Sequence, residues 1–356
     1  MDINLKKVYE GKNVLVTGGA GFIGSNLVHR LVGLGAKVAV VDALIPGLGG
    51  REENLKGLEN KIFFRREDIA DKDFISDILS YLNPKFIFNV AGSIKHSSKT
   101  EEDDSFDNRI NYVSHLHFLR VLREFLIRHS KPVSLIYAGT RDQYGRIPAE
   151  KLPVTEEFHA FDFPDNQSIS KQAAENHHSR LTSLVQSAGV PISVASLRLV
   201  NTYGPRQNLN CGAVVPTYIK KALENEELEV WGGGNILRDI NYVDDVVDAI
   251  LLTGATDNSA FTAYNLGCFL PGYHKNPLEA DSICTIKQLA NQIVQIIGRG
   301  SVVEREYPAG RKAIEPGNCY SDISKIYKEI GWRPKVSLEE GLKRTKEFLQ
   351  NQCVSR

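Results

Sequence analysis

The sequence is poor in the residues that mark several classes of protein. Its five cysteines lie at scattered positions without the spacing of a zinc site, so neither a disulfide framework nor a metal site is expected. It also has no surplus of positive charge, because 43 Lys and Arg residues balance 43 Asp and Glu residues. This balance argues against binding to a phosphate backbone, and we expect no nucleic-acid partner.

Long apolar runs are also absent. The longest, such as residues 38–41 and residues 246–252, which Asp248 interrupts, are far shorter than the roughly 20 residues that cross a bilayer. The first residues lead directly into a strand-like segment, with no apolar stretch before a cleavage site of small residues. We therefore expect a soluble, cytoplasmic protein with no membrane partner.

Short apolar strands alternate with amphipathic helices over the first part of the chain. Between Asn13 and Ser196, runs rich in β-branched residues are separated by segments whose apolar residues recur every three to four positions. This alternation predicts an α/β fold with a Rossmann-type doubly wound parallel sheet. The predicted strands are 13–17, 37–41, 62–65, 86–90, 133–138 and 192–197, and the predicted helices are 22–34, 73–82, 105–128 and 168–187.

The pattern changes near residue 200, where turns rich in Gly, Pro and Asn begin. We predict a nucleotide-binding domain over residues 1–200, to which residues 236–265 return. A smaller mixed α/β cap, with C-terminal helices, is then expected from residues 201–235 and 266–356.

Three glycines mark the turn between the first predicted strand and helix. Gly18 permits a tight turn, Gly21 lets the backbone approach a pyrophosphate, and Gly24 lets the helix pack closely on the strand. Phe22 and Ile23 begin the helix, where free N–H groups can receive phosphate oxygens. This strand, turn and helix predict a dinucleotide site.

Acidic residues follow the next two predicted strands. A carboxylate at Asp42 can accept hydrogen bonds from ribose hydroxyls and would repel a 2′-phosphate, so NAD is predicted in preference to NADP. The alternative for Asp42 is a simple loop cap. Asp68 and Ile69 are candidates for contact with adenine, although an aspartate after a strand is equally a turn former.

Further segments, taken in order with the glycine turn, resemble the extended short-chain dehydrogenase/reductase family. That family contains sugar-nucleotide 4-epimerases, dehydratases and decarboxylases, and the resemblance covers nearly the whole chain. It implies NAD as the cofactor, with Ala91 among the residues that bind it. The matching segments are 17–24, 90–93, 140–145, 170–175, 197–206, 238–246 and 330–334.

The resemblance also implies a catalytic set that this sequence changes at one position. In the family a Thr or Ser holds the sugar hydroxyl, a Tyr removes its proton, and a Lys four residues later binds the nicotinamide ribose. The matching positions are Thr140, Gln167 and Lys171, so the tyrosine is missing. An amide cannot serve as the base, and the chemistry has therefore moved to another group or has been lost.

Two groups are candidates to replace the tyrosine. Lys171 is the first, because an amine beside a positive nicotinamide ring can titrate low enough to accept a proton. Asp142 stands where the family's dehydratases and decarboxylases have a glutamate, although it is equally interpreted as a turn carboxylate paired with Arg141. Arg141 could instead grip a carboxylate or phosphate of the substrate.

The cap carries matches to the residues that hold the nucleotide half of the substrate. Asn201 corresponds to an asparagine that binds a phosphate or sugar oxygen, and Arg238 to an arginine that pairs with the diphosphate. The alternative for Arg238 is a surface ion pair with Asp239. A second cation is expected from Arg311 or Lys312, between which the sequence does not decide.

The leading interpretation is an NAD-dependent sugar-nucleotide epimerase that transiently oxidises a ring carbon. The alternatives are a 4,6-dehydratase or dehydrogenase of the same fold, and a catalytically weak NAD-binding sensor or scaffold. Segments 105–128 and 168–187 match the helices that form the family's dimer interface, which implies a homodimer; otherwise their apolar stripes belong to the core.

Overall fold

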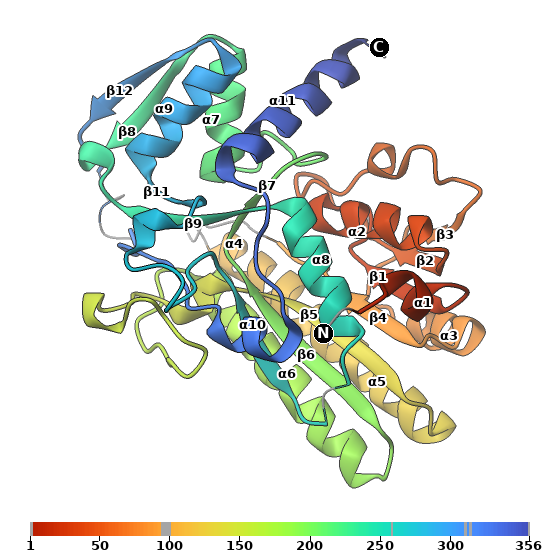
Figure 1. The fold of residues 1–356 in the computed structure, drawn as a ribbon. Helices are drawn as coiled ribbons and strands as arrows, with labels where there is room; N and C mark the ends of the chain where they lie inside the picture. Colours follow the sequence, from red (N-terminus) through yellow and green to blue (C-terminus); the bar gives the residue numbers. More distant parts are fainter. Residues whose placement is uncertain (1–2, 94–100, 258, 310–311, 313–314, 355–356) are drawn as a thin grey trace. The chain divides into compact units, whose positions relative to one another are not determined.

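The computed structural model describes residues 3–93, 101–257, 259–309, 312 and 315–354, and its chain divides into two compact units (Figure 1). The first unit comprises Met1–Gln143, Asp165–Arg198 and Val247–Tyr264. The second comprises Tyr144–Pro164, Leu199–Val246 and Asn265–Arg356. Each unit is formed by segments that are discontinuous in sequence.

A seven-stranded sheet organises the first unit, in the order β10-β6-β5-β4-β1-β2-β3. The pairings among β1 to β5 are parallel, and the strand order reverses direction between β1 and β4. The predicted Rossmann-type α/β fold is therefore confirmed. The strands are β1 Asn13–Thr17, β2 Lys37–Val41, β3 Ile62–Arg65, β4 Phe86–Asn89, β5 Val133–Thr140, β6 Ile192–Leu199 and β10 Thr262–Leu266.

The helices of this unit pack on the sheet through the apolar faces that the sequence predicts. One predicted helix, 105–128, is interrupted, because a five-residue π-helical segment, Arg109–Val113, separates α4 from α5. The helices are α1 Leu5–Tyr9, α2 Phe22–Gly33, α3 Lys72–Leu82, α4 Glu101–Asn108, α5 Ser114–His129, α6 Asn166–Ser187 and α8 Val243–Gly254, the last beginning in the second unit. No helix among the described residues is long and apolar enough to cross a membrane.

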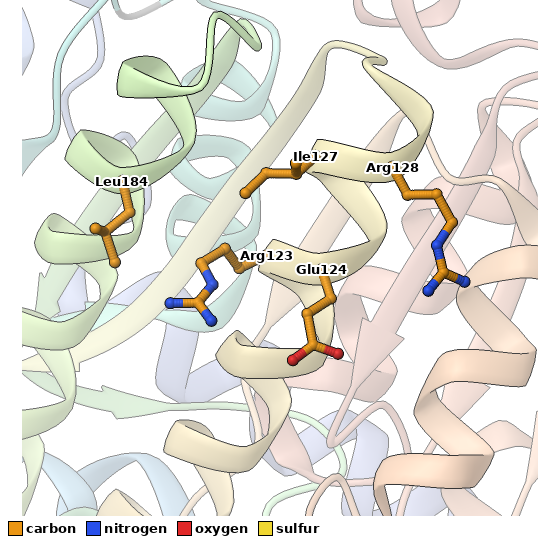
Figure 2. Close-up of a pocket in the computed structure, with 5 residues that line it drawn as sticks. All are labelled: Arg123, Glu124, Ile127, Arg128 and Leu184. Carbon is orange, nitrogen blue, oxygen red and sulfur yellow. The ribbon is translucent and has the colours of Figure 1, made fainter.

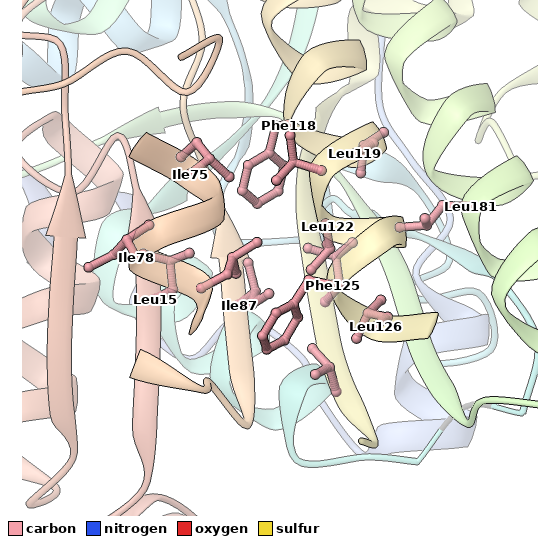
Figure 3. Packing of buried hydrophobic residues seen from close by; sticks show 14 of the residues in the cluster. Leu15, Ile75, Ile78, Ile87, Phe118, Leu119, Leu122, Phe125, Leu126 and Leu181 are labelled. Carbon is pink, nitrogen blue, oxygen red and sulfur yellow. The ribbon is translucent and has the colours of Figure 1, made fainter. Parts of the chain in front are cut away.

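One hydrophobic core of the first unit lies between the sheet and helices α3, α5 and α6 (Figure 3). Phe118 and Leu122 of α5 face Leu15 of β1 and Ile87 of β4, and all four side chains have no exposed surface. Burying such side chains contributes about 1.5–3 kcal/mol each. This packing fixes the carboxyl ends of the strands, from which the candidate site residues follow.

The second unit contains two small sheets and its own core. One sheet has the order β11-β9-β7, and the other pairs β12 with β8. Helices α7 and α9 contribute much of the core, and α9 begins with a capping box formed by Thr285 and Gln288. The elements are β7 Asn201–Tyr203, β8 Glu227–Trp231, β9 Leu237–Tyr242, β11 Ile283–Thr285, β12 Ser301–Arg305, α7 Val214–Leu223, α9 Ile286–Ile297, α10 Ser324–Ile330 and α11 Leu338–Val354.

Candidate functional site

The glycine turn after β1 is a close-packed cradle. Gly18 has a positive φ of 67°, and a Cβ there would lie 2.6 Å from the Cα of Ala91. A Cβ on Gly24 would collide with the carbonyl oxygen of Gly18, so α2 packs on the turn only without a side chain at this position. Gly21 is the N-cap of α2, and Phe22 and Ile23 follow as its first residues. This turn fits a dinucleotide, because it places helix N–H groups beside a backbone that carries no side chains at the three glycines.

Asp42 follows β2 and faces this turn. Its Oδ2 accepts a hydrogen bond from the backbone N–H of Ala20 at 3.0 Å, and its Oδ1 accepts one from Leu44 at 2.9 Å. Burial raises the pKa of the carboxyl group, although the backbone hydrogen bonds oppose that effect. Asp42 therefore caps the loop, and its carboxylate retains acceptor capacity for ribose hydroxyls.

The other predicted cofactor residues lie at the ends of β3 and β4. The carboxylate of Asp68 accepts a hydrogen bond from the N–H of Ala70 at 2.8 Å, as a turn former does, and Ile69 is 6% exposed. Ala91 approaches Gly18 closely, as described above. A contact of Asp68 or Ile69 with adenine stays a prediction.

Thr140 ends β5 and begins a hydrogen-bonded turn. Its backbone N–H donates to the side-chain oxygen of Gln143 at 2.8 Å, and its hydroxyl donates to Oδ2 of Asp142 at 2.9 Å. The guanidinium of Arg141 lies 3.2 Å from Oδ1 of the same carboxylate. The turn therefore brings Thr140, Asp142 and Arg141 together, and the predicted pairing of Asp142 with Arg141 is present.

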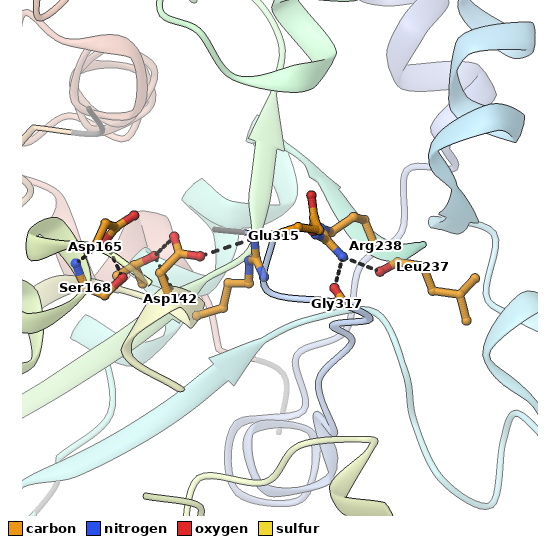
Figure 4. Close-up of polar contacts among 9 residues, drawn as sticks. Asp142, Asp165, Ser168, Leu237, Arg238, Glu315 and Gly317 are labelled. Atoms are coloured by element: carbon orange, nitrogen blue, oxygen red, sulfur yellow. Dashed lines mark hydrogen bonds and ion pairs between the residues drawn. The ribbon is translucent and has the colours of Figure 1, made fainter. Parts of the chain in front are cut away.

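Helix α6 presents Gln167 and Lys171 one turn apart on its buried face. Asp165 caps the helix by accepting hydrogen bonds from the N–H and hydroxyl of Ser168, at 2.9 and 2.6 Å (Figure 4). Gln167 is 2% exposed, and its side-chain oxygen has no hydrogen-bond partner among the described residues. Position 167 is thus enclosed, and no tyrosine hydroxyl is available there.

Lys171 extends from α6 to the carboxyl end of β5. Its ammonium donates to the carbonyl of Ala138 at 3.1 Å and lies 5.1 Å from the ring centre of Tyr137. A Cβ at Gly92 would lie 2.7 Å from Nζ, so the backbone after β4 also borders the amine. Burial lowers the pKa of Lys171 to about 8, because a desolvated ammonium is disfavoured.

Glu175 lies one turn after Lys171 in α6 and forms an ion pair with Arg198. Arg198 donates from Nη2 to Oε1 at 2.6 Å and from Nε to Oε2 at 3.2 Å, and the hydroxyl of Ser196 donates to Oε2 at 2.6 Å. Burial raises the pKa of Glu175, but the bonds from Arg198 and Ser196 outweigh it, and the pKa lies below its ordinary value. The carboxylate on the same helix is therefore committed to Arg198.

A buried polar network that the sequence analysis did not single out lies at the end of β4. Thr17 donates to Oδ1 of Asn89 at 2.7 Å, and Nδ2 of Asn89 lies 3.0 Å from Nδ1 of His115 and 3.1 Å from Nε2 of His178. Nδ1 of His178 lies 2.8 Å from the carbonyl of Ala174, so a neutral His178 is protonated there and accepts from Asn89 at Nε2. The only sequence signal was an asparagine at the end of an apolar strand.

The predicted nucleotide-binding residues of the second unit occupy two neighbouring strands. Asn201 begins β7, and Arg238 lies in β9, which pairs with β7. Arg238 is 6% exposed and donates to the carbonyls of Leu237 and Gly317 and to Glu315 (Figure 4). Arg238 therefore does not lie at the surface, as the alternative supposed: its guanidinium is buried and pairs with Glu315.

The remaining expectation in this unit concerned a second cation. Arg311 lies outside the described residues, whereas Lys312 is described and exposed. Elsewhere in the described chain, no group of three or more His, Cys, Asp or Glu side chains could hold a metal ion.

The chain is similar to a known protein family and to solved structures. Residues 14–267 match the family described as NAD dependent epimerase/dehydratase. UDP-glucuronic acid decarboxylase 1 of Xenopus tropicalis is 28% identical over 351 residues, which cover 96% of this chain and 73% of the relative. UDP-glucose 4-epimerase of Thermotoga maritima, solved with UDP-glucose, superposes with a TM-score of 0.79 at 29% identity, covering 96% of this chain and 99% of that one.

The UDP-glucose 4-epimerase of Thermus thermophilus, solved in complex with NAD, has a TM-score of 0.76 at 26% identity, covering 95% of this chain and 98% of that one. The family match spans the glycine cradle, Thr140 and Lys171, and the fold is shared along almost the entire chain. This chain belongs to the NAD-dependent epimerase/dehydratase family.

Proposed function

We propose that the protein is a sugar-nucleotide epimerase that transiently oxidises a ring carbon of its substrate. The observation that carries this proposal is the arrangement of Thr140 and Lys171 at the carboxyl end of β5. NAD, when bound, supplies the chemistry of accepting a hydride from the substrate carbon and returning it. Similarity to UDP-glucose 4-epimerases at 29% identity is compatible with this reaction, and UDP-glucuronic acid decarboxylases are similar at 28%.

The first unit would hold the cofactor and orient the reacting hydroxyl. Gly18, Gly21 and Gly24 would seat the pyrophosphate, and Asp42 would accept hydrogen bonds from a ribose. Lys171 would bind the nicotinamide ribose and assist proton transfer. Its pKa of about 8, lowered by burial, makes a proton-accepting amine accessible near neutral pH.

The second unit would bind the nucleotide half of the substrate. We assign Asn201 to a phosphate or sugar oxygen and Arg238 to the diphosphate, with Arg311 or Lys312 as the second cation. The hydrogen bonds from Arg238 to Glu315 and to two carbonyls fix the orientation of its guanidinium. A planar guanidinium held in one orientation can donate paired hydrogen bonds to a phosphate.

Two other functions have one supporting observation each. A dehydratase needs an acid and a base at the sugar ring, and Asp142 beside Thr140 favours that reaction. A weakly catalytic NAD-binding sensor is favoured by Gln167, which cannot act as the base. The retained Thr140 supports an enzyme, because a protein that only binds NAD has no need of a group that orients a substrate hydroxyl.

We also propose that the chain forms a homodimer through α5 and α6. A groove of about 500 Å³ lies on this face between Arg123, Glu124, Ile127 and Arg128 of α5 and Leu184 of α6 (Figure 2). Ile127 is 43% exposed and Leu184 is 38% exposed, which leaves apolar surface bordered by charged side chains, and interfaces between proteins have an apolar centre with a polar rim. Sedimentation at micromolar concentration tests this assembly, and a monomeric mass would contradict it.

Mass spectrometry of reaction products tests the proposed reaction. The purified protein is incubated in heavy water, with and without added NAD, against a panel of sugar nucleotides. A new isomer of unchanged mass supports an epimerase that returns the hydride, whereas loss of water indicates a dehydratase. Failure to convert any sugar nucleotide, while the protein binds NAD, would favour the sensor.

A further inference from the structure

We propose that Thr140 and Asp142 form a proton relay, in which the proton of the substrate hydroxyl passes through Thr140 to Asp142. The inference rests on the proposed function, because it concerns the hydroxyl that becomes a ketone during oxidation. It assigns the role of the missing tyrosine to a hydroxyl and a carboxylate two residues apart.

The hydrogen bonds of the Thr140 hydroxyl determine what it can do with a substrate. A hydroxyl has one hydrogen and two lone pairs. The hydrogen is donated to Oδ2 of Asp142 at 2.9 Å, and one lone pair accepts the backbone N–H of Asp142 at 3.2 Å. One lone pair remains within the described structure, and it can only accept. A substrate hydroxyl that binds there must therefore donate its own hydrogen to Thr140.

The surrounding turn holds this geometry in place. The backbone N–H of Thr140 donates to Gln143, whose side chain is 2% exposed, so the threonine cannot move independently of the core. Arg141 lies 3.2 Å from the other oxygen of Asp142, Oδ1, and this ion pair holds the carboxylate in its orientation toward Thr140. The Arg141 and Asp142 side chains are 11% and 15% exposed, which limits competition from solvent.

The relay moves protons and leaves the charges balanced. The O–H bond of the substrate breaks as a new O–H bond forms at Oγ1 of Thr140, and the original proton of Thr140 bonds to Oδ2 of Asp142. The substrate oxygen keeps the electron pair of the broken bond, and the aspartate becomes a neutral acid. The reverse sequence returns the proton when the ketone is reduced.

The other candidate groups, Gln167 and Lys171, fit this step less well. The side chain of Gln167 is an amide and is not basic. Lys171 donates to the carbonyl of Ala138, two residues before Thr140, and that contact suits an amine holding the nicotinamide ribose. The relay therefore leaves Lys171 with the cofactor and gives the substrate proton to Asp142.

Kinetics of matched variants test the relay. Asp142→Asn and Thr140→Val should each lower kcat about 10²–10⁴-fold with little change in KM, since a positioned base contributes that much. Thr140→Ser keeps the hydroxyl and should retain activity within a few-fold. The double variant should be no slower than the worse single variant, because both changes interrupt one path. Asp162→Asn is the control, since this aspartate is 63% exposed and its described ion pair is with Arg146.

A second measurement needs no cofactor. Infrared titration of the NAD-free protein should show a carboxyl signal that disappears in Asp142→Asn and shifts in Thr140→Val, because the hydroxyl stabilises the carboxylate. Thr140→Val also covers the case in which Asp142→Asn fails to fold. An Asp142→Asn enzyme that turns over within threefold of wild type, or an unshifted signal in Thr140→Val, would overturn the relay alone. A wild-type protein that converts no sugar nucleotide would overturn the proposed function, and the relay with it.

Discussion

Arg198 occupies both carboxylate oxygens of Glu175, through bonds of 2.6 and 3.2 Å in which the side chains are only 7% and 3% exposed. Glu175 follows Lys171 by one turn of α6 and would otherwise be its natural counter-ion. Because Glu175 pairs with Arg198, its carboxylate does not serve as the counter-ion of Lys171. Burial then lowers the pKa of Lys171 to about 8.

The first prediction is that Lys171→Met stabilises the protein at pH 7 and that this advantage shrinks above pH 8. The pKa of Lys171 is lowered from 10.5 to about 8 by burial, so the unfolded chain binds more protons between these values. Wild-type stability should thus rise with pH across this window, by about 3 kcal/mol in total. Urea unfolding at several pH values measures the free energy of unfolding of wild type and Lys171→Met. Lys72→Met, on the surface of α3, is the control. Parallel pH profiles for wild type and Lys171→Met would contradict the assignment.

The second prediction concerns the buried ion pair itself. Arg198→Met leaves the Glu175 carboxylate buried without its partner and should cost about 3–5 kcal/mol of unfolding free energy. Adding Glu175→Leu removes the uncompensated charge and should restore most of that loss. If the double variant is as unstable as Arg198→Met, packing rather than charge explains the effect.

The third prediction is that His178 resists protonation in mild acid. Burial lowers its pKa from 6.5 to about 4, so between these values the unfolded chain binds more protons and stability falls as the pH falls. This group alone should account for about 3 kcal/mol of the decline. The pKa of His115 is shifted in the same direction, also chiefly by burial. His178→Phe should therefore flatten the decline between pH 6.5 and 4 without abolishing it.

Nitrogen-15 NMR provides an independent check of the same network. The geometry around Asn89 predicts different tautomers for the two neutral imidazoles. His178 should carry its proton on Nδ1, which faces the carbonyl of Ala174, and His115 should carry its proton on Nε2. Identical tautomers for the two residues would contradict the proposed orientation of the Asn89 amide.

The sequence predicted the first unit well where local patterns decide the structure. The strands at 13–17, 37–41 and 62–65 have the predicted bounds, because apolar runs of that length end at clear turn residues. Gly18 and Gly24 were identified by spacing, and the structure adds the steric reason for each. The π-helical segment 109–113 was missed, since its apolar spacing hardly differs from that of an α-helix.

Contacts between distant parts of the sequence could not be predicted. Asn89 lies 26 residues from His115 and 89 residues from His178, and no periodicity links them. Arg238 was compared with its neighbour Asp239, whereas its acidic partner, Glu315, is 77 residues away. Such pairs arise from tertiary packing, and a single sequence without packing information does not reveal them.

The fourth prediction is that Gly24→Ala impairs NAD binding at least tenfold. The added methyl group would collide with the carbonyl of Gly18 and lie 2.7 Å from the Cα of Gly19, so the start of α2 must shift away from the cradle. Gly33→Ala on the same helix is the matched control, because its Cβ would meet nothing within 4 Å. That control should leave affinity unchanged and raise stability by about 0.4–1 kcal/mol. Calorimetric titration with NAD measures both variants, and equal affinities would show that the cofactor does not use this turn.

The fifth prediction is that Gln167→Tyr lowers activity instead of restoring it. Gln167 is only 2% exposed, so the larger ring must displace its neighbours, and overpacking of this kind costs about 1–3 kcal/mol. A relay through Thr140 and Asp142 also has no need of a phenol. We expect kcat to fall at least tenfold. Gln167→Met is the control, because it removes the amide at a similar volume and so distinguishes the effect of losing the amide from the effect of overpacking.

The opposite result would be equally informative. A gain of 100-fold or more in Gln167→Tyr with an ordinary sugar nucleotide would mean that the native site lacks an effective base. It would remove the support for the relay, because a working path from Thr140 to Asp142 would leave a new phenol little to add. It would also favour the NAD-binding sensor, since the native protein would then bind a cofactor and a substrate but lack the base that the reaction requires.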